Sequence, residues 1–239
     1  MLPCQSWGPV VENPSEKSSD VRLRRLRAVG SVLVACVCGW FVMELEILGV
    51  RMLTPYFGSA VYVVTGSVIG VFLLSLSVGY MAGGYVSNRD NSQRIIGVNL
   101  IIAGVWFFSL PFFVDAVCEM IFGWGLDEKW GSLLATLFLF GIPTMLLATV
   151  SPTVVRWLTR RPADAGFNTG LVLTVSTIAS FAGCVVTAFY LVTLSLRLTI
   201  RVSGIVLVLL GGSVVLCGLL CGKGSCCGPV CPEEVEDEA

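Results

Sequence analysis

The stretch AVYVVTGSVIGVFLLSLSVGYMA, residues 60–82, contains no charged side chain and consists almost entirely of apolar and small residues. A bilayer core of about 30 Å is crossed by about 20 apolar residues in an α-helix. This stretch alone therefore predicts a membrane-spanning helix, and similar stretches lie on both sides of it. We place six such helices at residues 28–50, 60–82, 95–114, 131–153, 168–194 and 198–221.

The composition agrees with a protein that crosses the membrane several times. Apolar residues make up 55% of the 239 residues and charged residues 13%, whereas soluble domains average about 45–50% and about 25%. The net charge of −1 gives no overall field that attracts nucleic acid. The sequence predicts an all-α polytopic membrane protein whose main contact is the lipid bilayer, with no nucleic acid bound.

The positions of the basic residues predict the orientation. With six spans, the N-terminal segment, the loops after the second and fourth helices and the C-terminal tail share one side, which carries most of the 15 Lys and Arg residues. By the positive-inside rule this side is cytoplasmic. We expect a protein of the cell (inner) membrane with both termini cytoplasmic. Its predicted parts are a basic segment (1–27), a six-helix membrane domain (28–221) and a Cys-containing acidic tail (222–239).

Charged residues lie within or at the ends of the first and sixth predicted helices, where an ionisable group is costly unless it is paired or hydrated. Glu44, Glu46 and Arg51 belong to the first helix and Arg201 to the sixth. At about 100° per residue, Glu44 and Arg51 share one face and Glu46 points almost opposite. We favour an ion-pair network in which Arg51 or Arg201 compensates Glu46. The alternatives are a carboxylate that binds a proton or cation, and side chains that extend to the outer interface.

The second helix contains small residues and ends in a polar turn. Gly66 and Gly70, like Gly79 and Gly83, are spaced so that helix backbones can approach closely, and we expect this helix to be buried among others. The stretch GYMAGGYVSNRD, residues 79–90, predicts a tight cytoplasmic loop, with gating as the alternative. Its candidate residues are Gly79, Tyr80, Gly83, Gly84, Asn88 and Arg89.

Three prolines fall within or near the ends of the third and fourth predicted helices: Pro111, Pro143 and Pro152. Proline frees a backbone carbonyl and bends a helix. We therefore expect kinks at these positions. Breaks of this kind can also line a cavity.

Four cysteines lie close together where the chain leaves the last predicted helix: Cys221, Cys226, Cys227 and Cys231. A vicinal pair with irregular spacing differs from the paired CxxC pattern of a zinc site. These residues are therefore weak metal candidates, and we predict neither a metal nor a cofactor. The alternatives are reduced or lipidated cysteines next to the membrane.

The segment from Glu44 to Arg89 resembles the start of the membrane domain of spermidine-synthase-like proteins, described as fused major-facilitator and spermidine synthase proteins. Residues 141–161 and 169–194 are similar to that family's fourth and fifth helices. The matching positions are Glu46, Arg51, Pro55, Phe57, Gly58, Gly79, Tyr80, Gly83, Gly84, Arg89, Ser151, Pro152 and Arg156. Two departures are Glu44, an additional acid, and Asn88, which stands where the family usually has Asp.

The resemblance implies six helices similar to half of a major facilitator transporter, whose halves are parallel repeats. In the fused proteins a soluble Rossmann-like aminopropyltransferase domain follows. Here 18 residues follow residue 221, and no glycine fingerprint of a nucleotide-binding turn is seen. We expect a chain that is not an enzyme but a scaffold or anchor for a partner enzyme or membrane complex, as a homo-oligomer or hetero-complex. The alternative is a half-size, major-facilitator-like transporter of small cations such as polyamines.

Overall fold

The computed structural model describes residues 14–58, 61–89, 91–159 and 165–221, and these residues contain helices and no strand. Most of the helices are α-helices. The fourth crossing contains a π-helical turn, and a short 3-10 turn precedes the last helix. The elements are α1 (Pro14–Phe57), α2 (Val61–Val86), α3 (Ser92–Gly123), α4 (Glu128–Thr136), η1 (Leu137–Gly141), α5 (Ile142–Ala148), α6 (Val150–Leu158), α7 (Ala165–Phe189), η3 (Leu191–Thr193) and α8 (Leu196–Cys221).

Among the residues that the structure describes, six helical segments are long and apolar enough to cross a membrane, which confirms the predicted all-α, multi-pass class. Elements α4 to α6 together form one of them. The segments are Ala28–Phe57, Tyr62–Val86, Ser92–Gly123, Glu128–Leu158, Ala165–Thr193 and Leu196–Leu219.

Several helices were predicted too short. The third helix was expected to end at residue 114, before the first acid, but α3 continues to Gly123. Asp115 lies within this helix and is bonded to Tyr56 of α1 and Arg197 of α8; a helix backbone satisfies its own polar groups, so a charged side chain does not have to end it. At the other end of the chain, α1 begins at Pro14, so much of the basic segment predicted as residues 1–27 is an extension of the first helix.

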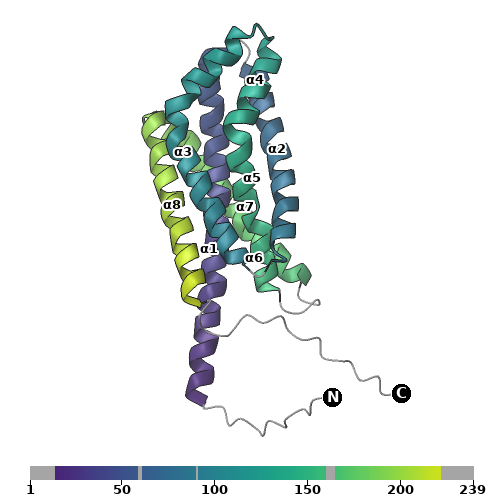
Figure 1. The fold of residues 1–239 in the computed structure, drawn as a ribbon, viewed down its shortest axis with the longest axis vertical. Helices are drawn as coiled ribbons and strands as arrows, with labels where there is room; N and C mark the ends of the chain where they lie inside the picture. The colour runs from purple at the N-terminus through teal and green to yellow at the C-terminus, as the bar shows by residue number, and fades with distance from the viewer. Residues whose placement is uncertain (1–13, 59–60, 90, 160–164, 222–239) are drawn as a thin grey trace, which may run out of the picture.

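The helices form one elongated bundle (Figure 1), with α1 running through it and extending beyond it at the lower end. Helix α8 packs mainly on α3, and α7 packs mainly on α1. The start of α1 and the end of α8 lie at the same end of the bundle (Figure 1), as an even number of crossings requires.

Helices α3 and α8 are in backbone-to-backbone contact at two pairs of glycines. A Cβ atom added to Gly104 would lie 2.7 Å from the Gly204 carbonyl oxygen, and one added to Gly211 would lie 2.7 Å from the Gly97 carbonyl oxygen. The two helices are antiparallel, so the pairs stack along one seam. Any larger side chain at these positions has to push backbone aside.

The prediction for the glycines of α2 is half right. A Cβ on Gly79 or Gly83 would lie 2.5 Å from the carbonyl oxygen of Met145 or Thr149, so this part of α2 packs closely on α5 and α6. Gly66 and Gly70 are exposed and have no atom within 4 Å of an added Cβ. Gly66 and Gly79 are thirteen residues apart, which is about 220° around a helix. The two pairs therefore lie on different faces, and α2 is buried on one side only.

The fourth crossing is irregular next to its first proline, as expected. The π-helical turn η1 ends directly before α5, in which Pro143 is the second residue. Proline lacks an N–H and leaves the carbonyl four residues earlier without its helical donor, which here is that of Leu139. The indole N–H of Trp106 on α3 donates to this carbonyl at 2.9 Å. By contrast, α3 continues through Pro111.

Candidate functional site

Glu44 lies inside the bundle, where α1 meets α8. Its side chain is 2% exposed. The indole N–H of Trp40 donates to Oε2 at 3.2 Å, and the Ser203 hydroxyl of α8 lies 2.5 Å from Oε1. The same hydroxyl lies 3.0 Å from the Thr199 carbonyl. Both hydrogen-bonding groups around this carboxyl are neutral.

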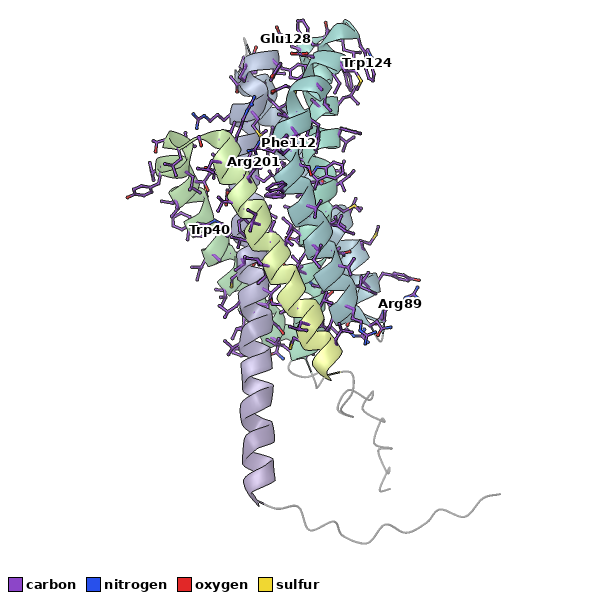
Figure 2. The ribbon with its side chains drawn as sticks, turned by 60° about the vertical axis from the view of Figure 1, so that its left-hand side comes forward. Trp40, Arg89, Phe112, Trp124, Glu128 and Arg201 are labelled. Carbon is purple, nitrogen blue, oxygen red and sulfur yellow. The ribbon has the colours of Figure 1, made fainter. Side chains whose placement is uncertain are left out.

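The two arginines of the predicted cluster point to other parts of the bundle. Arg51 donates to the carbonyl of Val192 in η3. Arg201 lies over the ring of Phe112 on α3, with its guanidinium carbon 4.5 Å from the ring centre, and Figure 2 shows the two side chains next to each other. The Nε of Arg201 is buried without an acceptor among the described residues.

The prediction of an ion-pair network among these four residues is therefore wrong. Within the described part of the chain, neither Glu44 nor Glu46 forms a salt bridge with Arg51 or Arg201. For Arg201 the reason is the rotation of α8: Arg201 and Ser203 are two positions apart, which is about 200° around the helix. Ser203 faces α1, and Arg201 faces α3. Glu46 is partly buried and has no partner among the described side chains.

An ion pair forms nearer the end of the bundle, between two residues that were not predicted to pair. Arg197 of α8 donates to Asp115 of α3 at 2.9 Å, and the Tyr56 hydroxyl of α1 donates to the other oxygen of Asp115 at 2.8 Å. Asp115 therefore joins three helices. The available signal was position: Asp115 ends the apolar run of the third helix, and Arg197 starts the sixth.

The predicted cytoplasmic loop is shorter than expected. Gly79, Tyr80, Gly83 and Gly84 belong to α2, which ends at Val86. A tight turn follows, in which the Arg89 N–H donates to the Val86 carbonyl at 3.0 Å and the Asn88 N–H donates to the Tyr85 carbonyl at 3.2 Å. Arg89 also donates to the Tyr85 hydroxyl at 2.9 Å and stacks on its ring. The polar residues thus make a compact turn, with Asn88 and Arg89 exposed.

The predicted cysteine group falls largely outside the described residues. Cys221 is the last residue of α8, and Cys226, Cys227 and Cys231 lie beyond it. Within the described ranges, no group of three or more Cys, Asp or Glu side chains is arranged to hold a metal ion. Five cysteines of the membrane region are free thiols: Cys36, Cys38, Cys118, Cys184 and Cys217.

No protein-family model, curated protein or solved structure matches the chain. The fold defines its class as a multi-pass helical membrane protein with six candidate spans. The resemblance to the membrane domain of spermidine-synthase-like proteins therefore remains a prediction from the sequence.

Proposed function

We propose that the chain is a non-catalytic membrane subunit that anchors a partner enzyme or membrane complex at the cytoplasmic side of the cell inner membrane. The observation that carries this proposal is that most of the ionisable side chains inside the bundle bond to other parts of the same chain. Glu44, Arg51, Asp115 and Arg197 all bond to other helices or turns of the same chain. These groups hold helices together, which suits a structural subunit better than chemistry on a substrate.

The exposed surface of α2 supports a role in assembly. Gly66 and Gly70 face outward with open space above them. Similar glycines inside the bundle, such as Gly104 and Gly204, are the places where two helices touch. A second copy or another subunit on this face would fit the expected likeness to half of a major facilitator transporter, because two such halves make one transporter body.

Purification from native membranes in mild detergent, with identification of co-purifying chains, tests the proposal. We expect recovery with a second copy or with a partner in fixed ratio. Gly66→Leu should weaken that association without unfolding the chain, because nothing lies within 4 Å of its added Cβ. Gly212→Leu is the matched control, since this exposed glycine of α8 is equally open. A monodisperse chain recovered alone from native membranes contradicts the proposal.

One observation favours a second candidate, a transporter of small cations such as polyamines. Glu46 is a partly buried acid on α1 with no partner among the described side chains, and an unpaired acid inside a membrane marks a candidate ligand or proton path. In proteoliposomes, Glu46→Gln should then abolish spermidine uptake while leaving folding intact. Glu119→Gln, at an exposed acid of α3, is the control. Absence of uptake by the unmodified chain refutes this candidate.

A further inference from the structure

The Ser203 hydroxyl lies within hydrogen-bond distance of two acceptors, Glu44 and Thr199, but it can donate to only one of them. The Ser203 Oγ lies 2.5 Å from Glu44 Oε1 and 3.0 Å from the Thr199 carbonyl oxygen. Both distances are those of hydrogen bonds, but a hydroxyl carries a single hydrogen. If this hydrogen goes to Thr199, the hydrogen between the other two oxygens has to come from the carboxyl of Glu44.

The surroundings of Glu44 favour the same assignment. The side chain is 2% exposed, and its second oxygen accepts the indole N–H of Trp40. An ionised carboxylate in such a place is costly without a countercharge. A neutral carboxylic acid fits instead, because one oxygen accepts from Trp40 and the other donates to Ser203.

Charged side chains on the neighbouring helices are engaged elsewhere or lie toward the helix ends. On α8, Arg201 lies over Phe112, and Arg197 is paired with Asp115 of α3. Helices α2, α5 and α7 contain no Asp, Glu, Lys or Arg within their bounds. On α1 itself, Glu46 is partly buried and Arg51 bonds to Val192. The helices packed against α1 carry these other titratable or charged side chains in their described parts: Tyr62, Tyr80, Tyr85, Arg94, Cys118, Glu119, Glu128, Lys129, Arg156, Cys184 and Cys217.

We propose that Glu44 is a proton-binding site inside the membrane, held as a carboxylic acid that donates its proton to Ser203 and so fastens α8 to α1. When a hydroxide ion removes this proton, the products are a carboxylate and water. The negative charge then faces only neutral donors, and Ser203 has to turn its hydrogen away from Thr199. Proton loss therefore leaves a negative charge without a countercharge between α1 and α8 and removes the bond from Ser203 to Thr199. This inference does not rest on the proposed anchoring role.

Infrared spectroscopy of the full chain in lipid nanodiscs tests the protonation state directly. At neutral pH, the difference spectrum between the unmodified chain and Glu44→Gln should contain the C=O band of a protonated carboxyl group, and this band should persist in Glu46→Gln. Carboxylate bands in place of the protonated band would overturn the proposal.

A second measurement follows the stability of the same variants against pH. A glutamine at position 44 can donate its amide N–H to Ser203 and accept from Trp40, so Glu44→Gln should match the unmodified chain below about pH 4, where an exposed glutamate is also protonated, and should be the more stable of the two at neutral pH. Unfolding of the unmodified chain exposes Glu44 to water and releases its proton, so its stability should decrease as the pH is raised. Glu44→Gln should lack this part of the pH dependence. Equal pH dependence in the two proteins, or a severe loss of stability in Glu44→Gln at neutral pH, would refute the proposal.

Discussion

Replacing Gly211 by alanine tests the glycine seam between α3 and α8. The added Cβ would lie 2.7 Å from the Gly97 carbonyl oxygen and 2.9 Å from the Ile101 nitrogen, both backbone atoms of α3. Ordinary contact begins near 3.4 Å, so the helices have to separate by about 0.7 Å, a gap that forfeits a quarter to a half of the dispersion attraction between facing atoms. Overpacking of this kind typically costs about 1–3 kcal/mol.

The adjacent glycine supplies the control. Gly212 is exposed, with nothing within 4 Å of an added Cβ, so Gly212→Ala changes only helix propensity, which favours alanine by about 1 kcal/mol. Both variants share this gain. The free energy of unfolding of Gly211→Ala should therefore fall below that of Gly212→Ala by about 1–3 kcal/mol.

Denaturation by SDS in mixed micelles, followed by tryptophan fluorescence, measures the difference under identical conditions. Gly97→Ala should combine with Gly211→Ala less than additively, because the first methyl group has already separated the helices. Equal stability of Gly211→Ala and Gly212→Ala would refute the close approach of the two backbones.

Three further predictions concern other contacts and the orientation. Asp115→Asn removes an ion pair whose side chains are 66% and 45% exposed, so it should cost at most about 1 kcal/mol and reduce the dependence of unfolding on salt. Trp106→Phe leaves a buried carbonyl without its donor and should cost about 1–3 kcal/mol of unfolding free energy; Pro143→Ala restores a backbone N–H and should recover part of this loss in the double variant. In intact cells, an impermeant thiol reagent should label Asp127→Cys and leave Gln93→Cys unlabelled; the reverse pattern means that the topology is inverted.

The sequence predicted the number of crossings because each crossing needs a long apolar run, and such runs can be counted. It placed the helix ends less well. Asp115 and Glu119 interrupt the hydropathy pattern of the third helix, yet α3 includes both. A charged residue ends an apolar run in the sequence without ending the helix, because the helix backbone satisfies its own polar groups.

The sequence did not predict which charged residues meet, because pairing depends on how each helix is rotated about its axis. Glu44 and Arg201 are at similar depth, but α8 turns Ser203 toward α1 and Arg201 toward α3. A usable signal was present in Gly204 and Gly211, which lie seven residues apart and face α3. Arg201 lies about 300° from Gly204 around the helix, which is only about 60° in the other direction. Packing Gly204 and Gly211 against α3 therefore also places Arg201 near α3.

The bond from Trp106 to Leu139 bears on how the chain enters the bilayer during synthesis. The fourth span brings into the lipid the Leu139 carbonyl, to which Pro143 cannot donate a hydrogen bond. A carbonyl without a hydrogen-bond donor is poorly tolerated in the lipid. The indole of Trp106, which donates to this carbonyl, belongs to the third span, and that span emerges from the ribosome first. The two spans are therefore best released into lipid as a pair, with the tryptophan already in place when the proline-containing segment leaves the insertion machinery.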